Sequence, residues 1–229
     1  MTTTVGLFCE LFRLELLQAL EVRLRQAGFA AVAGVDEAGR GCLAGPVVAA
    51  AVVPGPGPAI PGVDDSKRLE PEARFQLARE IRRTASAFAV VHVAAEVIDR
   101  INILEASRLA MRRAVADLRP AADCVVTDAM PLPGIGVPCI PVVKGDALSY
   151  AVACASILAK AERDARMVEL DRELPWYGFA AHKGYSVPEH LAAIERYGPS
   201  REHRLTFRSA VPRLEEYDRP LSLRMAGGH

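Results

Sequence analysis

Hydrophobic and polar positions follow two different periods along this chain. Short apolar runs rich in Val and Ala, without helical spacing, occupy five segments. Runs of this length and composition, bounded by Gly and Pro, predict buried β-strands. The five predicted strands cover residues 32–37, 47–53, 87–94, 124–128 and 140–143. Glycines join the first two, which predicts a hairpin, and the segment 54–58 alternates Pro and Gly and predicts a loop.

Between the strands, apolar residues recur at three- and four-residue intervals, which predicts helices. The predicted helices span residues 7–26, 71–83, 96–118 with a break near 101–102, and 149–172, and a last one starts near Pro188. The first helix is amphipathic, and its residues allow packing on its own domain, the interpretation we favour, or contact with a membrane surface or partner. Strands interleaved with helices indicate an α/β domain.

Composition narrows the class of protein. A chain of 229 residues fits one domain with or without terminal elaborations, and 51% hydrophobic residues exclude global disorder. The 28 basic and 28 acidic residues balance, so the net charge gives no indication of a nucleic-acid partner. The five cysteines are scattered, which disfavours a zinc site or disulfide framework. No apolar run reaches the ~20 residues of a membrane span, and no signal peptide is apparent, so we expect a soluble, cytoplasmic protein.

Acidic residues follow several of the predicted strands. Asp36, Asp128 and Asp146 end strand-like segments, and Glu37 adjoins the first. Ligands of α/β domains gather at strand ends, and carboxylates without patterned His or Cys favour hard cations such as Mg²⁺ or Mn²⁺. Two such ions ~4 Å apart can promote phosphodiester hydrolysis. Neighbouring strand residues point to opposite faces, so Asp36 and Glu37 should not both face one pocket. The alternative is that these acids are ordinary turn or solvated residues.

Two other segments allow more than one interpretation. Near Asp64–Arg68, an Asp/Ser pair either caps the following helix or lets Ser66 and Lys67 bind phosphate. The segment 181–208 is rich in Lys, Arg and Tyr within a neutral chain. It either tracks a nucleic-acid backbone or forms a solvated face.

An ordered series of motifs resembles the ribonuclease HII family. Gly34-Val35-Asp36-Glu37-Ala38-Gly39-Arg40-Gly41 and the residues through Ala50 look like its opening motif. The blocks that follow in order are Asp65–Leu69, Ile98–Leu104, Val143–Asp146, Ala155–Lys160 and His182–Tyr185. The likeness covers roughly Ala31 to Phe207, nearly the whole predicted domain.

This resemblance implies a ribonuclease H-like mixed β-sheet flanked by helices, with a helical C-terminal part. It implies a Mg²⁺- or Mn²⁺-dependent endonuclease that cuts RNA in RNA–DNA hybrids and cuts 5′ to single ribonucleotides in duplex DNA. Such cutting would serve ribonucleotide and RNA primer removal in DNA repair and replication. The metal ligands and catalytic residues carried over by position are Asp36, Glu37, Asp128 and Asp146.

The resemblance also indicates substrate-binding residues. Gly39, Arg40 and Gly41 match the element that reads the ribose 2′-hydroxyl through backbone groups and grips the adjoining phosphate. Tyr185 matches the tyrosine that stacks on the sugar at the RNA-to-DNA junction. A 2′-hydroxyl alone separates RNA from DNA at one position, so its reader must approach closely, which glycine permits. We add Lys67, Ser149 and Lys183 as further candidates.

Two positions depart from the family pattern. Ala129 follows Asp128 where Gly is usual, and Leu148 stands where a basic residue commonly precedes Ser. The second departure removes an expected phosphate contact. Asp164 also matches a family aspartate, and we predict that it pairs structurally with a basic neighbour.

We expect three segments: an N-terminal helical extension over 1–30, the catalytic domain over 31–210, and a tail over 211–229, in a monomer. The competing hypotheses are a ribonuclease HIII-like nuclease with poor single-ribonucleotide activity, and a non-catalytic hybrid-binding protein. The roughly 30 residues before Ala31 are too few for the extra domain usual in the former. All four acids are present, which disfavours the latter.

Overall fold

A mixed five-stranded sheet forms the centre of the molecule. The computed structural model describes residues 4–207. The strands are β1 (Val32–Ala38), β2 (Val47–Val53), β3 (Ala87–Val93), β4 (Cys124–Asp128) and β5 (Cys139–Val142), in the spatial order β3-β2-β1-β4-β5. The hairpin of β1 and β2 predicted from the glycine-rich junction is confirmed, because the two strands pair antiparallel.

Parallel pairing fixes where the strand ends meet. β4 pairs parallel with β1, and β5 pairs parallel with β4, while β3 pairs antiparallel with β2. The carboxyl ends of β1, β4 and β5 therefore lie at one end of the sheet. Ligand sites of open α/β sheets form at such ends.

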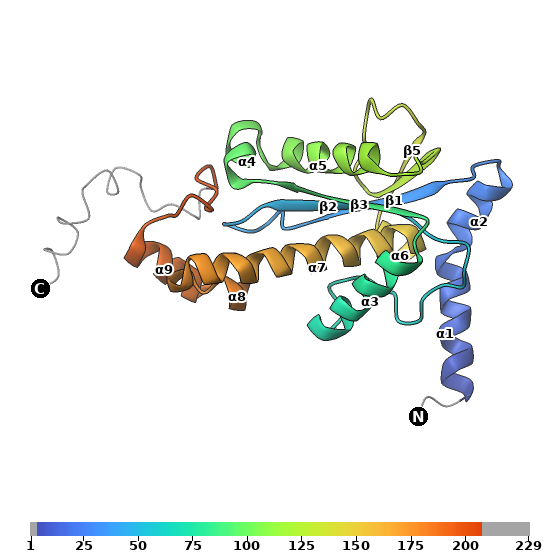
Figure 1. The fold of residues 1–229 in the computed structure, drawn as a ribbon, viewed down its shortest axis with the longest axis horizontal. Helices are drawn as coiled ribbons and strands as arrows, with labels where there is room; N and C mark the ends of the chain where they lie inside the picture. The colour runs from blue at the N-terminus through green and yellow to red at the C-terminus, as the bar shows by residue number, and fades with distance from the viewer. Residues whose placement is uncertain (1–3, 208–229) are drawn as a thin grey trace, which may run out of the picture.

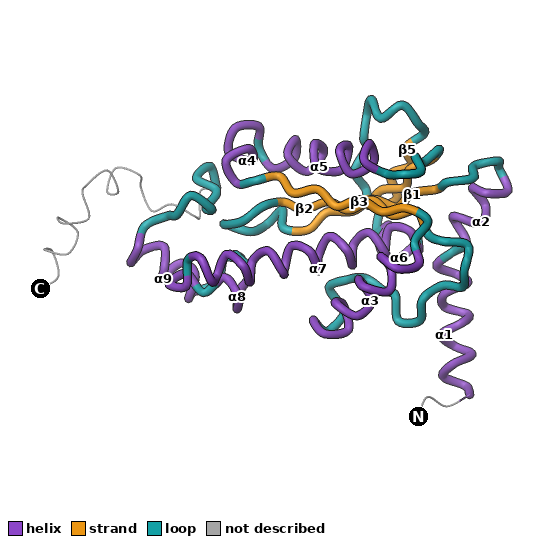
Figure 2. Tube along the Cα trace, in the orientation of Figure 1, coloured by secondary structure: helices purple, strands orange, loops and turns teal. Residues whose placement is uncertain are grey.

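Helices cover both faces of the sheet, as Figures 1 and 2 show. On one face lies α5 (Ile103–Asp117), preceded by the short α4 (Ala95–Ile101). The break predicted near 101–102 is confirmed, since Asn102 separates the two helices and its side chain caps α5. On the other face lie α7 (Tyr150–Glu173) and α3 (Pro71–Thr84).

The contact between β1 and α7 requires a glycine. A Cβ atom at Gly34 would lie 2.0 Å from the backbone carbonyl carbon of Ala151. No real Cβ tolerates such a contact, so the absence of a side chain lets the strand lie directly on the helix. The alanines that the sequence places along α7 at 151, 153, 155, 159 and 161 are buried, as close packing requires.

The predicted N-terminal helix is two helices in the structure. α1 (Thr4–Leu17) and α2 (Ala19–Gln26) are separated at Gln18, and Figure 1 shows α1 extending away from the sheet. Leu14 and Leu17 are buried against the domain, which agrees with the favoured interpretation of a helix packed on its own domain.

The C-terminal part is helical, as expected. It comprises the 3-10 turn η1 (Pro175–Tyr177), α8 (Phe179–His182) and α9 (Pro188–Tyr197). A four-residue helix, α6 (Gly145–Leu148), follows β5 and leads into α7. The predicted tail over 211–229 lies outside the described residues. Within residues 4–207, no helix is long and apolar enough to cross a membrane.

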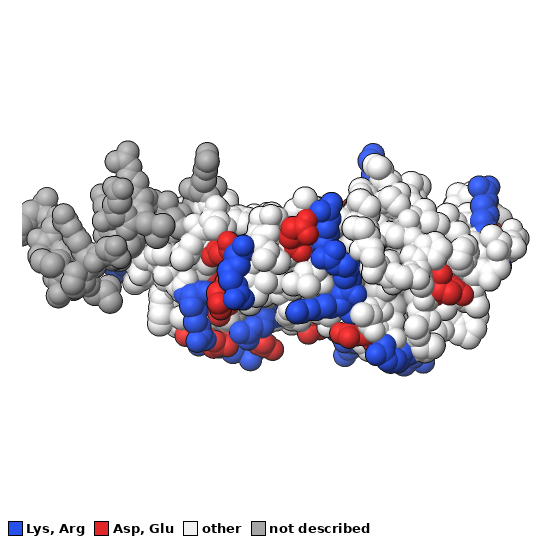
Figure 3. Space-filling model, turned by 90° about the horizontal axis from the view of Figure 1, so that it is seen from above, with Lys and Arg blue, Asp and Glu red and all other residues white. Residues whose placement is uncertain are grey.

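Charged side chains of both signs are interspersed on the face that Figure 3 shows. On α4 and α5, Arg100 lies 3.8 Å from Glu96, and Arg108 lies 2.6 Å from Glu105. Such exposed pairs contribute little to stability. Basic and acidic side chains are therefore mixed on this face rather than separated into patches of one sign.

Candidate active site

β1 carries Asp36 into the interior at the end of the sheet. The residue is 6% exposed, and its carboxylate accepts a 2.8 Å hydrogen bond from the backbone N–H of Glu37. Burial raises the pKa of Asp36 well above its ordinary value, and the neighbouring charge of Glu37 adds to that rise. A cation close to this carboxylate would stabilise its charged form.

Glu37 is the second acid of the site. Its Oε1 accepts a 3.2 Å hydrogen bond from Nη1 of Arg40, whereas its buried Oε2 has no partner among the described residues. Burial raises the pKa of Glu37, against the attraction of Arg40, which lowers it. An unpartnered buried carboxylate oxygen is costly, and a cation or donor at that point would remove the cost.

Asp36 and Glu37 both line a cavity of about 330 Å³. The expectation that they face different pockets, from strand alternation, is wrong. β1 ends at Ala38, and the cavity lies past that end, where the chain turns into Gly39–Gly41. Side chains from both faces of a strand reach the same space there.

Asp128 ends β4 beside β1 and lines the same cavity. Its Oδ1 accepts a 2.9 Å hydrogen bond from the backbone N–H of Gly145, which ties the end of β4 to the start of α6. Ala129, one of the departures from the family pattern, has φ +54°. An alanine therefore adopts the left-handed conformation that glycine would occupy without strain.

Asp146 is placed differently from the prediction. It lies in α6 rather than at the end of a strand, because β5 stops at Val142. Burial raises the pKa of Asp146, and Asp128 and Asp65 add to that rise, while Lys67 opposes it. Nζ of Lys67 lies 3.6 Å from Oδ2 of Asp146.

Lys67 balances part of this negative charge. Burial lowers the pKa of Lys67, but the attraction of Asp65, Asp146, Asp36 and Asp128 outweighs burial and raises it overall. The acids from β1, β4 and α6 therefore interact electrostatically through Lys67, although they are far apart in the sequence, and Asp146 itself is not among the residues that line the cavity.

Two buried arginines hold the loop that follows β1. Arg163 of α7 donates from Nε to the carbonyl of Pro46 and from Nη2 to that of Ala44, both at 3.1 Å. Arg204 donates to the carbonyls of Gly45 and Arg40. These bonds fix the main chain on which Gly39, Arg40 and Gly41 are carried.

The two glycines of this loop serve different needs. Gly39 has φ +95°, and a Cβ there would lie 2.0 Å from Nε of Arg163. Gly41 has nothing within 4 Å of a Cβ position, so the space beside it is open. The backbone conformation and the contact with Arg163 thus require a glycine at position 39, whereas Gly41 leaves its backbone accessible at the cavity.

Tyr185 also lines the cavity. The residue is 42% exposed, and Nζ of Lys160 and the guanidinium carbon of Arg163 lie 5.5 Å and 5.9 Å from the ring centroid. An exposed aromatic ring backed by cations offers a flat surface for a sugar or base.

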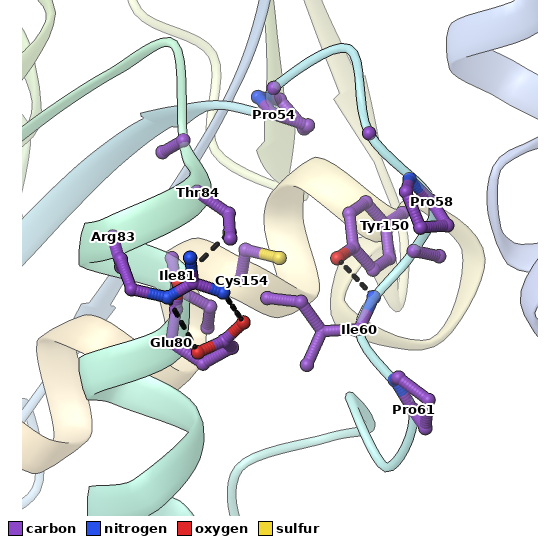
Figure 4. A pocket seen from close by; sticks show the side chains of 14 residues that line it. Pro54, Pro58, Ile60, Pro61, Glu80, Ile81, Arg83, Thr84, Tyr150 and Cys154 are labelled. Carbon is purple, nitrogen blue, oxygen red and sulfur yellow. Dashed lines mark hydrogen bonds and ion pairs between the residues drawn. The ribbon is translucent and has the colours of Figure 1, made fainter.

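Figure 4 shows a different hollow, of about 230 Å³, between the 54–61 loop, α3 and α7. The hydroxyl of Tyr150 accepts a 2.9 Å hydrogen bond from the N–H of Ile60 there, and burial raises the pKa of Cys154 to about 12. Its one acid, Glu80, is paired with Arg83. The four predicted acids do not line this hollow.

The acid set suits a hard divalent cation. Carboxylate oxygens would be the ligands, and the buried Oε2 of Glu37 lacks a partner among residues 4–207. Burial, with neighbouring acids adding to it, raises the pKa of Asp36 and Asp146. In the described part of the chain, no group of three or more His, Cys, Asp or Glu side chains is close enough to enclose an ion alone. An ion bound here would take further ligands from water or substrate.

The comparison with known families agrees with this arrangement. A sequence model of the family described as Ribonuclease HII matches residues 33–210. The chain belongs to the ribonuclease HII family. Ribonucleases HII are endonucleases that hydrolyse RNA in RNA–DNA hybrids, which favours an enzyme over the non-catalytic alternative.

Individual relatives support the assignment. Ribonuclease HII of Solibacter usitatus is 53% identical over 188 residues, which cover 82% of this chain and 82% of that protein. A structure of the PCNA:RNase HII complex from Archaeoglobus fulgidus matches with a TM-score of 0.67 and 26% identity, over 82% of this chain and all of that one. The ribonuclease H-like fold predicted from the resemblance is confirmed.

A more distant structure shows the same fold. Bst-RNase HIII in complex with Mn²⁺ matches with a TM-score of 0.60 and 21% identity, over 81% of this chain and 70% of that one. At this identity the likeness concerns the fold alone.

Some candidate residues of this ribonuclease HII lie away from the cavity. Ser149 is fully buried, caps α7 and donates a 2.5 Å hydrogen bond to Glu21 of α2. The ammonium group of Lys183 donates a hydrogen bond to the carbonyl of Ala180. The structure thus gives Ser149 a buried contact with Glu21 and places neither Ser149 nor Lys183 in the lining of the cavity.

Ser66 does not cap α3, and its side chain is buried. Glu70 precedes the first residue of α3, without a side-chain cap, so the predicted Asp/Ser capping is wrong. The hydroxyl of Ser66 lies 2.9 Å from that of Ser156, and both line the cavity with Lys67.

Sequence reasoning gave no role to three residues that build this site. Ser156 and Lys160 of α7 line the cavity, and Arg163 supports its loop. Their spacing along α7 was the available signal. The predicted structural pairing of Asp164 is confirmed, since it lies 2.7 Å from Lys160 and 3.1 Å from Arg74.

The basic C-terminal segment is only partly a surface. His203 and Arg204 are buried, so they contribute to packing rather than to a charged face. Arg196 and Arg201 are exposed, whereas Arg208 lies outside the described residues. Neither a face that tracks a nucleic-acid backbone nor a solvated face therefore describes the whole segment.

Proposed function

We propose that this ribonuclease HII cuts RNA–DNA hybrids in a divalent-metal-dependent reaction and also cuts 5′ to a single ribonucleotide embedded in duplex DNA. The observation that carries the proposal is one cavity lined by Asp36, Glu37 and Asp128 together with Gly41 and Tyr185. Acids for a cation and a surface for a sugar thus share one space. Such incision would begin ribonucleotide removal and contribute to RNA primer removal.

Asp36, Glu37, Asp128 and Asp146 are the residues that would hold Mg²⁺ or Mn²⁺. When bound, the cation would supply Lewis acidity that activates water and neutralises the leaving oxygen of the phosphodiester. Because the described carboxylates do not enclose an ion alone, we expect weak binding without substrate and tighter binding with it.

Cationic side chains of the site would bind phosphate. Arg40 is half exposed, lines the cavity, and lies in a loop whose main chain Arg204 holds at the Arg40 carbonyl. Lys67, with its side chain 75% exposed, is already drawn to the acids. A guanidinium can grip two phosphate oxygens, whereas an ammonium acts as a point charge.

The open backbone at Gly41 and the ring of Tyr185 would recognise the junction. A 2′-hydroxyl needs a close donor or acceptor, which an accessible main chain supplies. The neighbouring deoxyribose lacks that hydroxyl and leaves room for an aromatic ring. Selection for an RNA-to-DNA step would follow from these two contacts acting on adjacent sugars.

The test compares two substrates with matched variants. Wild-type protein and Tyr185→Ala are assayed on a DNA duplex with one ribonucleotide and on a long RNA–DNA hybrid, each with Mg²⁺, Mn²⁺ or chelator. The control is Tyr197→Ala, because Tyr197 of α9 is 40% exposed, like Tyr185, and does not line the cavity.

We expect Tyr185→Ala to lose more activity on the single-ribonucleotide duplex than on the hybrid, and Tyr197→Ala to lose neither. Equal losses of Tyr185→Ala on both substrates would contradict the junction role. Undiminished cleavage in chelator would contradict the metal requirement.

A further inference from the structure

Three histidines surround the turn that carries Tyr185. His182 ends α8, His190 lies in α9, and His203 lies in the segment after α9. The rings of His182 and His190 are stacked, with centroids 4.3 Å apart, and the centroids of His190 and His203 are 5.2 Å apart. His190 and His203 are buried, although neither lines the cavity.

Hydrogen bonds determine the protonation of His203 and His190. The backbone N–H of Ser200 donates to Nδ1 of His203 at 2.9 Å, so the proton of a neutral His203 resides on Nε2. That Nε2 lies 3.1 Å from Nε2 of His190. Nδ1 of His190 lies 2.9 Å from the carbonyl of Tyr185, which can only accept, so His190 carries its proton on Nδ1 and accepts from His203 on Nε2.

The result is a directed chain from Ser200 through His203 and His190 to the Tyr185 carbonyl. Both rings must be neutral to form it, and burial lowers the pKa of each to about 4. The chain is therefore intact at neutral pH.

His182 holds the other side of the same turn. Its Nδ1 accepts a 3.1 Å hydrogen bond from the N–H of Gly184, and its Nε2 donates to the carbonyl of Tyr177 at 2.7 Å. The N–H of Tyr185 donates to the carbonyl of His182, and the carbonyl of Gly184 accepts from the N–H of Leu43. The backbone of Tyr185 is thus bonded on both sides, while its ring remains in the cavity.

We propose that His190, oriented by His203, is a positioning residue that sets the placement of the Tyr185 ring and thereby the preference for an RNA-to-DNA junction. The inference rests on the proposed function of Tyr185. His190 acts through the Tyr185 carbonyl and does not touch substrate. The Tyr185 side chain is held near Lys160, Arg163 and the Cys42 thiol, and the His190 bond adds to these contacts by holding the main chain that carries the ring.

Substitutions at His190 separate its hydrogen bonds from its volume. Phe keeps a ring for stacking on His182 but removes both hydrogen bonds. Gln carries an amide donor and acceptor at about the separation of the two ring nitrogens, so it can rebuild the chain. Asn has the same groups on a shorter side chain and serves as a second disrupting variant if the Phe variant does not fold.

The measured quantity is the ratio of kcat/KM on the single-ribonucleotide duplex to kcat/KM on a long RNA–DNA hybrid, at neutral pH, in the full chain. We expect His190→Phe and His190→Asn to lower this ratio roughly 3- to 10-fold, the effect of losing one buried hydrogen bond, and His190→Gln to retain it. Thermal midpoints identify folded variants. His92→Phe, on β3 and outside the cavity lining, is the control and should leave the ratio unchanged.

A merely structural role would lower both activities in proportion to lost folded protein, with no change in the ratio, and would overturn the inference. Tyr185→Ala is measured beside these variants. If Tyr185→Ala changes the ratio and the folded His190 variants do not, the positioning role fails alone. If Tyr185→Ala leaves the ratio unchanged, the junction role of Tyr185 has failed first, and the inference falls with it.

Discussion

Arg204→Met tests how the C-terminal part supports the active-site loop. The guanidinium is fully buried and donates to the Gly45 carbonyl from Nε and Nη2, at 3.1 and 2.9 Å, and to the Arg40 carbonyl from Nη1 at 3.0 Å. Burial lowers the pKa of Arg204 to about 10, which remains high enough to keep it charged at neutral pH. Met keeps much of the aliphatic volume and removes all three donors.

The size of the effect follows from these contacts. Hydrogen bonds from a charged donor contribute roughly 1.5–3 kcal/mol each, and the substitution leaves two carbonyls without this donor. Removing a buried cation relieves part of its desolvation cost, so we expect a net loss of about 3 kcal/mol in the free energy of unfolding. In a chain of this size that corresponds to a fall of roughly 6–12 °C in the thermal midpoint.

Urea or thermal unfolding measures the loss, with Arg201→Met as the control. The Arg201 side chain is 78% exposed and only 3.4 Å from Glu173 and Glu202, so its loss should change stability by less than about 0.5 kcal/mol. Because Arg204 fixes the carbonyl of Arg40, folded Arg204→Met should also lose roughly 10- to 100-fold in kcat/KM. A stability loss below about 1 kcal/mol, with unchanged kcat/KM, would refute the reasoning.

Three other substitutions or conditions give separate tests. Asp36→Asn should abolish cleavage yet unfold at an equal or higher temperature, because burial raises the pKa of this acid and its charge is unfavourable; retained turnover, or a large fall in the midpoint, would contradict this. Gly34→Ala should destabilise the fold by about 2 kcal/mol or more in chemical denaturation, since its Cβ would meet the backbone of Ala151; wild-type stability would show that β1 and α7 separate easily. His190 and His203 have pKa values lowered to about 4, so unfolding takes up protons below the ordinary pKa of 6.5. Their contribution is complete above that pH and is lost between about 6.5 and 4. We expect roughly 3 kcal/mol from each histidine, and His190→Gln should about halve the pH dependence of stability over this range.

The strands and most helices could be predicted because local signals specify them. The glycine-rich junction of β1 and β2 predicts the hairpin, and Asn102 marks the break between α4 and α5. The position of Asp146 could not be read in the same way. Apolar residues continue to Val143, but pairing with β4 stops at Val142, and only the tertiary fold turns the chain there into α6.

Long-range contacts explain the rest of the difference. The sequence predicts a substrate contact for Ser149, but in the fold α2 brings Glu21, which lies 128 positions away in the sequence, to its hydroxyl. Arg204 belongs to a basic segment, yet it is buried because Gly45 and Arg40 present carbonyls to it. A charge pattern alone cannot distinguish a solvated arginine from one that binds the main chain.

Cleavage of an end-labelled DNA duplex that contains one ribonucleotide tests the central claim most directly. The cut is mapped with Mg²⁺, with Mn²⁺ and with chelator, beside Asp36→Asn as the inactive control. We predict a single cut on the 5′ side of the ribonucleotide, present with either metal and lost in chelator and in the variant. Cleavage of a long RNA–DNA hybrid without any cut in the single-ribonucleotide duplex would contradict the assignment of Gly39–Gly41 and Tyr185 as the junction reader.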